Sequence, residues 1–153
     1  MTQLTRTGGD VATRLRGTIA RTERLLARQT TGSLTRTQFS VLGALARAGR
    51  LRLAVLVERE GVNPTMLSRI VGALEADGLL ARSPDPDDGR AVVLEVTDAG
   101  RELYQRLQGE RAALIEDYLR SLPPAQNRRL VEALPVLEGL AQHLHDGAAA
   151  GRP

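Results

Sequence analysis

The side chains best suited to recognise a polyanion lie at the start of one predicted helix. Asn63 can cap this helix, and Pro64 can occupy its first position, where the missing N–H group of proline costs nothing. A helix of this kind can enter the major groove of DNA, and the side chains of its first turns then meet base edges. Arg69 is the strongest single candidate, because arginine suits both guanine and phosphate. The predicted contacts are Thr65, Met66, Ser68 and Arg69.

A predicted hairpin follows this helix directly and carries a second candidate arginine. Residues 79–82 and 91–96 are typical of short strands, and residues 83–89 between them are turn chemistry throughout. Arg90 lies near the tip, where it can reach an adjacent minor groove; the alternative is a structural ion pair that shapes the turn. A capped helix followed by such a hairpin is the layout of a winged helix-turn-helix. That layout favours groove contact over a solvated helix face, although Met66 could equally belong to the core.

The elements before this helix are those that would position it. Thr35 and Gln38 have the spacing of a capping box at the start of a helix that ends at residues 48–49. Residues 50–53 alternate in polarity and predict a very short strand, and residues 53–60 predict a second short helix. Gly61 then makes the turn into the helix at Pro64. Two short helices joined by a glycine-centred turn predict a helix-turn-helix.

Longer helices with apolar stripes are predicted on both sides of this domain. The first runs from Asp10 to about Arg28, after a disordered N-terminus at residues 1–9. Another covers residues 97–120, and after a break at residues 122–124 a last helix carries apolar residues at alternating steps of four and three. A disordered tail is predicted at residues 147–153. We expect these helices to form a dimer through Val11, Leu15, Leu130, Leu134, Leu137 and Leu144.

The predicted fold is therefore mainly α with a small β-wing. Residues 34–99 form the winged helix-turn-helix DNA-binding domain, and residues 10–33 and 100–146 form N- and C-terminal dimerisation helices. The chain has 153 residues, which suffices for one domain with a sizeable core. No stretch has the length of a membrane span or the pattern of a signal peptide. We therefore expect a soluble, cytoplasmic, nucleoid-associated protein.

Several other classes of site lack support in the sequence. The chain has no cysteine, which leaves neither disulfides nor thiol redox sensing. No serine lies in a Gly-x-Ser-x-Gly context, so no catalytic residue is predicted. His143 and His145 would point roughly 200° apart on a helix, which argues against a shared metal site. No cofactor is predicted.

The net charge of +3 is unevenly distributed along the chain. Residues 1–60 hold 11 arginines and 4 acidic residues, whereas residues 61–153 hold 10 arginines and 14 acidic residues. Every basic residue is arginine, whose planar fork suits phosphate, although a GC-rich genome explains most of this bias. Arg36, Arg50 and Arg52 are candidates for contacts to backbone phosphates. Each of them alone is more typical of an ordinary surface arginine.

This order of elements and motifs resembles the MarR family (multiple antibiotic resistance regulators) over about residues 10–145. The combination is specific, although no single motif is. The matching residues are Leu34-Thr35, Gln38-Phe39, Leu56 through Gly61-Val62, Ser68-Arg69, Leu74-Glu75-Ala76-Asp77-Gly78-Leu79, Asp88-Gly89-Arg90 and Val96-Thr97-Asp98-Ala99-Gly100-Arg101.

The resemblance implies a homodimer whose first and last helices pair with those of the other subunit. Two recognition helices would occupy successive major grooves of a pseudo-palindromic operator, and the wings would flank them. The resemblance also implies that Asp88 orients Arg90. Such proteins are usually repressors released by small, often phenolic or aromatic, ligands.

Three features depart from the family pattern. Glu60 replaces an apolar residue before the turn glycine, and Arg52 replaces the Thr or Ser that usually caps the second short helix. The wing is acidic, with a net charge of −2. The acidic wing motivates an alternative function, a winged-helix module that dimerises or binds protein with little DNA affinity. The excess of arginine in residues 1–60 favours the first hypothesis, a sequence-specific regulator that binds double-stranded DNA.

Overall fold

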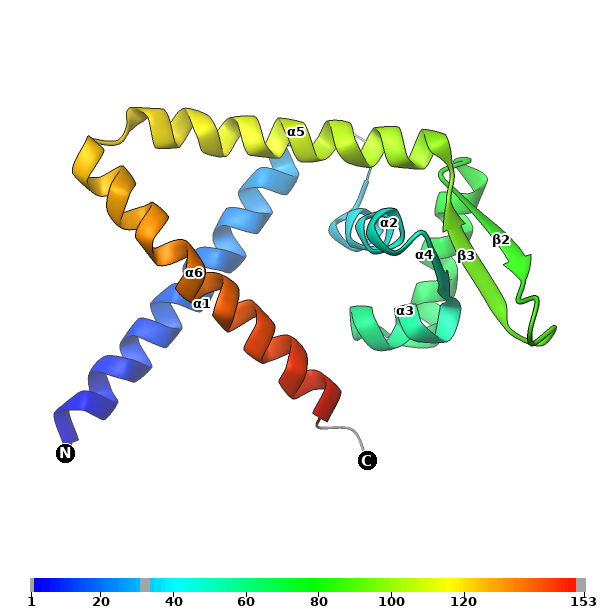
Figure 1. Cartoon of the computed structure of the whole chain (residues 1–153), viewed down its shortest axis with the longest axis horizontal. Coiled ribbons are helices and arrows are strands. Elements are labelled where there is room, and N and C mark those ends of the chain that lie inside the picture. Colours follow the sequence, from blue (N-terminus) through cyan, green and yellow to red (C-terminus); the bar gives the residue numbers. More distant parts are fainter. Residues whose placement is uncertain (1, 31–33, 151–153) are drawn as a thin grey trace. The chain divides into compact units, whose positions relative to one another are not determined.

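The computed structural model describes residues 2–30 and 34–150 and divides the chain into two compact units, residues 1–112 and 113–153 (Figure 1). Most of the described chain is helical, and the remaining regular structure is a small sheet, as the predicted fold class requires. The elements are α1 (Thr2–Thr30), α2 (Arg36–Ala48), β1 (Arg50–Arg52), α3 (Leu53–Glu60), α4 (Pro64–Ala76), β2 (Leu80–Pro84), β3 (Val92–Val96), α5 (Asp98–Ser121) and α6 (Pro124–Ala150).

Two helices of the first unit, α2 and α4, begin where the sequence places their caps. Thr35 and Gln38 form the predicted capping box at α2: the Gln38 N–H donates to Thr35 Oγ1 at 3.3 Å, and the Thr35 N–H donates to Gln38 Oε1 at 2.8 Å. Asn63 Oδ1 accepts from the Met66 N–H at 2.8 Å at the start of α4. Thr97 Oγ1 accepts a corresponding bond at the start of α5. Each bond satisfies an N–H group that has no partner within its helix.

The three strands form one antiparallel sheet in the order β1-β3-β2. β2 pairs with β3 from Leu80 opposite Val96 to Pro84 opposite Val92. β1 adds its three residues to the other edge of β3, with Arg52 opposite Val93. The hairpin of β2 and β3 is thus tied through β1 to the chain that leads into α3.

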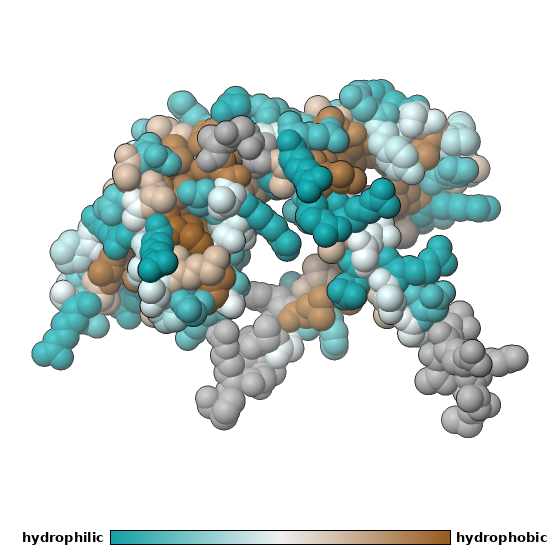
Figure 2. Space-filling view, turned by 180° about the vertical axis from the view of Figure 1, so that it is seen from behind, coloured by the Kyte–Doolittle hydropathy of each residue, from teal (hydrophilic) through white to brown (hydrophobic). Residues whose placement is uncertain are grey.

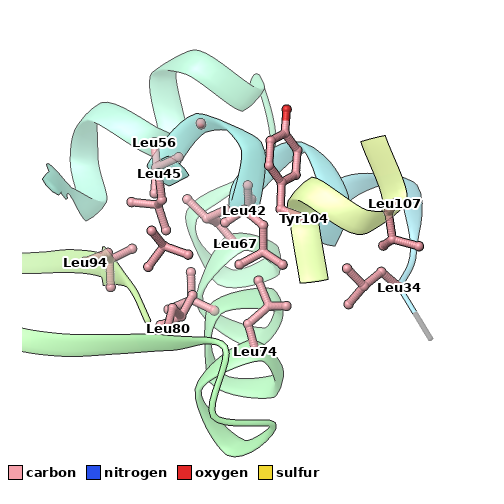
Figure 3. Packing of buried hydrophobic residues seen from close by; sticks show 14 residues of the cluster. Leu34, Leu42, Leu45, Leu56, Leu67, Leu74, Leu80, Leu94, Tyr104 and Leu107 are labelled. Carbon is pink, nitrogen blue, oxygen red and sulfur yellow. The ribbon is translucent and has the colours of Figure 1, made fainter. Parts of the chain in front are cut away.

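A core of aliphatic side chains holds the sheet against α2, α3 and α4 (Figure 3). Leu67, Val71 and Leu74 bury one face of α4, as their helical spacing predicts. Tyr104 is the one aromatic residue among the buried core residues that the structure describes, and the half-buried Phe39 packs against this core. Its largest fully buried side chains are Leu42, Leu45, Leu56, Leu67, Leu74, Leu94, Leu107, Val41 and Val71.

Two glycines allow α5 to approach the rest of the first unit closely. A Cβ atom at Gly43 would lie 2.8 Å from the ring of Tyr104, so the ring can pack directly on the backbone of α2 only because residue 43 has no side chain. A Cβ atom at Gly100 would lie only 1.9 Å from the carbonyl oxygen of Leu79, where α5 begins beside the end of α4. These contacts fix the start of α5 against the recognition helix and the base of the wing.

The two terminal helices are longer than their sequence patterns predict. α1 begins at Thr2, so the prediction of disorder at residues 1–9 is wrong for residues 2–9. The apolar repeat of Val11 and Leu15 extends back seven residues to Leu4, and this continuation outweighs the cost of two glycines in the helix. α6 continues to Ala150 because the predicted tail contains three consecutive alanines, the best helix formers. Residues 151–153 lie outside the described residues.

Hydrophobic side chains of these helices reach the surface of the protomer. Figure 2 shows such brown side chains among teal hydrophilic ones on the face in view. None of the helices in the described part of the chain is long and apolar enough to span a bilayer. The exposed large hydrophobic residues of α1 and α6 are Val11, Ile19, Leu25, Leu130, Val131, Leu134, Val136 and Leu144.

Candidate nucleic-acid interface

The outer face of α4 presents all four predicted contact residues. Thr65, Ser68 and Arg69 are exposed, and the Met66 side chain is 49% exposed, which excludes it from the core of the protomer. No ion pair or hydrogen bond occupies the Arg69 guanidinium among the described residues. The opposite face of α4 is buried, so the helix is held rigidly and its first two turns are free to contact a partner.

The turn before α4 has the geometry of a helix-turn-helix. α3 ends at Gly61, which adopts the left-handed conformation with φ 63° and donates its N–H to the Val57 carbonyl at 3.1 Å. Glycine takes this conformation without steric cost, which explains its place between the two helices. α3 and α4 both pack on α2.

The tip of the wing is closed by backbone hydrogen bonds and holds Arg90 on the outside. The Asp85 N–H donates to the Ala91 carbonyl at 2.9 Å, and the Ala91 N–H donates to the Asp88 carbonyl at 2.8 Å. Asp88 Oδ1 accepts from the backbone N–H of Arg90 at 3.1 Å, so Asp88 fixes the backbone of Arg90. The exposed Arg90 guanidinium has no ion pair among the described residues, and a structural ion pair of the wing involves another arginine instead.

That ion pair joins Arg52 to Asp85, a carboxylate only 6% exposed. Arg52 Nε donates to Asp85 Oδ2 at 2.6 Å, and the N–H groups of Asp87 and Asp88 donate to Asp85 Oδ1 at 2.9 and 3.3 Å. The hydrogen bond from Arg52, followed by that from the Asp87 backbone, lowers the pKa of Asp85 below its usual range. The same ion pair raises the pKa of Arg52. Its contact with a DNA phosphate stays a prediction, and its Nε is occupied by Asp85.

Other charges of the wing are also paired within the protein. Arg82 Nε lies 2.8 Å from Glu75 Oε2, and its Nη2 donates to the Ser68 carbonyl at 3.4 Å, which ties β2 to the recognition helix. Arg50 and Glu95 form a longer, exposed ion pair of 3.8 Å between β1 and β3. The net charge of −2 counted from the sequence therefore includes carboxylates whose charge is compensated nearby. Among the described residues, Arg90 at the tip makes no ion pair, and the neighbouring Asp87 and Asp88 make none either.

The remaining predicted site residues lie outside α4 and the wing. Arg36 is exposed in the first turn of α2. The predicted dimerisation residues are exposed or half-buried in the protomer, with Val11 at 54% and Leu144 at 63% exposure. Among the described residues, no group of three or more His, Cys, Asp or Glu side chains could hold a metal ion. The side chain of His145 lies outside the described residues.

Sequence reasoning missed a polar and aromatic cluster where α5 meets α2 and the end of α1. Arg111 is 7% exposed; its Nε donates to Thr30 Oγ1 at 3.2 Å, and its Cζ lies 3.7 Å from the centre of the Phe39 ring. The Phe39 ring packs on Tyr104, whose hydroxyl accepts from Arg47 Nη1 at 3.0 Å. Arg111 follows Tyr104 by seven residues, so its place on the buried stripe of α5 was visible in the sequence.

The Arg111 guanidinium is incompletely satisfied. Within residues 2–30 and 34–150, its buried Nη2 has no hydrogen-bond partner, and no carboxylate lies within ion-pair distance of the guanidinium. A buried guanidinium without a carboxylate is rare because removing its charge from water is costly. The Arg111 Nη2 therefore remains a buried donor without a hydrogen bond among the described residues.

Comparison with known proteins identifies relatives of both sequence and fold. The model of the MarR family matches residues 34–92, from the residue before the α2 cap to the start of β3. An uncharacterised HTH-type transcriptional regulator of Mycobacterium bovis is 30% identical over 103 residues, which are 67% of this chain and 72% of the relative. The HTH-type transcriptional repressor MdtR of Bacillus subtilis is 28% identical over 109 residues, and the match covers 71% of this chain and 68% of that protein.

A solved structure with the same fold is that of BpsR from Bordetella bronchiseptica, whose DNA binding is described as regulated by 6-hydroxynicotinic acid. Its TM-score is 0.63 at 27% identity, and the match covers 84% of this chain and 92% of that one. The winged fold, the exposed face of α4 and the free wing arginine thus occur in a chain whose relatives are transcriptional regulators.

Proposed function

The chain belongs to the MarR family of transcriptional regulators, and on that premise we propose that it is a repressor that binds a pseudo-palindromic operator as a homodimer. The observation that carries this proposal is that Arg69 on α4 and Arg90 at the wing tip make no ion pair among the described residues, whereas Arg50, Arg52 and Arg82 do. Arg69 contacts a guanine edge or a phosphate in the major groove, and Arg90 enters the neighbouring minor groove.

Replacement of each of the two arginines should change operator binding in a different way. Arg69→Ala weakens operator binding and relaxes base preference at one position per half-site, because a bidentate contact to guanine discriminates by about 1–3 kcal/mol. Arg90→Ala lowers affinity and flattens the salt dependence by about one ion equivalent per subunit. Arg128→Ala, an exposed arginine of α6, serves as the matched control and leaves binding unchanged.

The test uses a labelled duplex from the promoter beside this gene, titrated at several salt concentrations and with single-base variants of the site. Half-sites centred roughly 10 bp apart are expected, since a two-fold dimer places its recognition helices one helical turn apart. If Arg69→Ala and Arg90→Ala both bind like wild type, the exposed face of α4 and the wing is not the DNA-binding face. The protein-binding alternative would then replace the proposal.

Dimerisation is proposed from the hydrophobic residues that the protomer leaves exposed on α1 and α6. Leu134 is 45% exposed and Leu144 is 63% exposed, and both lie on the predicted seam of α6. Leu137→Asp places a charge in that seam and converts the dimer to monomer at micromolar concentration, because an unpaired buried charge costs several kcal/mol. Gln126→Asp adds the same charge on the exposed first turn of α6 and retains the dimer. Sedimentation of the wild type as a monomer would contradict the proposal.

A small aromatic acid is proposed as the effector that releases the operator. The regulation of BpsR by 6-hydroxynicotinic acid supports this class of ligand, and Arg111 supplies a chemical reason in this chain. Its unpartnered Nη2 and its stacking on Phe39 suit a planar carboxylate, which guanidinium groups bind bidentately. Arg36, exposed in the first turn of α2, adds a proposed contact to a backbone phosphate.

The effector is tested with a panel of aromatic carboxylates and their neutral amides. Carboxylates raise the melting temperature and release the labelled duplex, whereas the matched amides do neither, and Arg111→Met abolishes both effects. Lys in place of Arg111 is expected to retain part of the response, because the charge remains but the planar fork is lost. Equal responses to the acids and amides, or no response to the panel, would exclude this role for Arg111.

A further inference from the structure

We propose that the ion pair of Arg52 with Asp85 is a brace that sets the wing tip so that Arg90 is presented to DNA. This inference rests on the proposed function and assigns Arg52 a role different from phosphate contact. Arg52 and Asp85 are positioning residues in this account, because they act on DNA through Arg90.

The position of Arg52 in the fold explains why its side chain is available. Arg52 is the N-cap residue of α3, and its side chain makes no capping hydrogen bond there. The guanidinium instead reaches across the sheet to the turn after β2. Arginine at this position thus exchanges a local helix cap for a contact between parts of the chain 33 residues apart.

A continuous chain of hydrogen bonds leads from Arg52 to Arg90. Arg52 Nε holds Asp85 Oδ2, while Asp85 Oδ1 accepts the backbone N–H groups of Asp87 and Asp88. Asp88 Oδ1 then accepts the backbone N–H of Arg90. The three bonds beyond the ion pair each hold a backbone N–H of the tip, and Asp85, at the centre of the chain, is buried.

The Arg90 guanidinium itself has no partner among the described residues, so its direction depends on the backbone that carries it. A side chain placed by a rigid turn loses less conformational freedom on binding than one carried by a mobile turn. Breaking the brace therefore weakens the contact made by Arg90 without touching Arg90 itself.

The decisive variant is Asp85→Asn, because the brace and the bulk charge predict opposite changes in DNA affinity. The substitution removes one negative charge from a wing that approaches a polyanion, so simple electrostatics predicts tighter binding. The brace predicts weaker binding, since the isosteric amide no longer holds Arg52. Arg52→Gln is the second variant, and Arg50→Gln is the matched control: it removes the same charge two residues away, from an exposed pair of 3.8 Å that does not reach the tip.

The experiment titrates the full-length variants against the labelled promoter duplex over a range of salt. Asp85→Asn, Arg52→Gln and Arg90→Ala are expected to lose affinity by a similar factor, on the order of tenfold for a lost charge-assisted contact. Each flattens the salt dependence by about one ion equivalent per subunit. Combining Asp85→Asn with Arg90→Ala causes no further loss, because both act on one contact. Arg50→Gln adds its small effect independently of Arg90.

Amide hydrogen exchange without DNA gives a readout that does not depend on the operator. The amides of Asp87 and Asp88 exchange faster in Arg52→Gln than in wild type or Arg50→Gln, at a temperature where all variants are folded. Tighter or unchanged binding by Asp85→Asn would overturn the brace, as would additive losses with Arg90→Ala. A failure of the proposed function looks different, since Arg90→Ala itself would then bind like wild type.

Discussion

The close approach of α5 to the end of α4 can be tested with one substitution made at two positions of the same helix. Gly100 lies in the first turn of α5, where an added Cβ would be 1.9 Å from the Leu79 carbonyl oxygen and 2.9 Å from Val96 Cγ2. Gly109 lies two to three turns later on the exposed side, with nothing within 4 Å of an added Cβ. Alanine at the two sites should change stability in opposite directions.

The expected magnitudes follow from these contacts. Real Cβ atoms essentially never approach another heavy atom within 3.0 Å, so Gly100→Ala must push α5 from Leu79 by about 1 Å. Overpacking of this kind costs about 1–3 kcal/mol, and weakening of the bond from the Thr97 N–H to Leu79 adds about 1 kcal/mol. We expect a loss of about 3 kcal/mol, a large part of the roughly 5–15 kcal/mol that stabilises a typical protein. Gly109→Ala should gain about 1 kcal/mol from helix propensity.

The assay is urea unfolding of wild type and both variants at one protomer concentration, because dimerisation makes the apparent stability depend on concentration. Circular dichroism at 222 nm reports on the helices in a chain of this class. A Gly100→Ala protein within about 0.5 kcal/mol of wild type would refute the close approach. A loss of stability in Gly109→Ala would refute the claim that its site is open.

Three further outcomes test smaller features of the first unit. Thr35→Ala removes one bond of the capping box and should cost about 1 kcal/mol in urea unfolding, whereas Thr35→Ser should cost much less. Tyr104→Phe leaves the donors of Arg47 and Gln108 without their shared acceptor, and a loss of about 1 kcal/mol is expected by the same measurement. The pKa of Asp85 is lowered in the folded protein, so its stabilising contribution is present above the unfolded value of about 3.9 and is lost as the pH falls further. The stability difference between wild type and Asp85→Asn should therefore shrink below about pH 4, and a pH-independent difference would argue against the ion pair.

The parts of the fold that the sequence predicts correctly are those determined by neighbouring residues. The caps at Thr35 and Asn63 each act over three residues, and the structure confirms both. The predictions of helix ends were wrong where two local preferences competed. Glycines at residues 8–9 and at 147 favoured disorder, but the apolar repeat before Val11 and the alanines after residue 147 favoured helix, and helix formation prevailed.

Contacts between residues far apart in sequence could not be predicted in this way. Arg52 meets Asp85 across 33 residues, and Arg111 meets Thr30 across 81. Neither pair has a spacing that a helical or strand period selects. Arg111 was nevertheless recognisable as an unusual residue, because it continues the buried stripe of Tyr104 and Leu107 with a charged side chain.

The function of each arginine here follows from its partners and not from its type. Arg82 and Arg52 stand beside carboxylates and hold the wing to the recognition helix and to β1. Arg90 and Arg69 lack such partners and remain able to bind phosphate or bases. A count of charges treats all four as equal and gives an acidic wing that should repel DNA. Once the residues in ion pairs are removed from the count, Arg90, Asp87 and Asp88 remain, with a net charge of −1, and Arg90 is the remaining cation of a tip fixed by buried Asp85. An acidic wing is thus compatible with the proposed DNA binding, because two of its carboxylates, Asp85 and Asp88, bond to the backbone of the tip that carries Arg90.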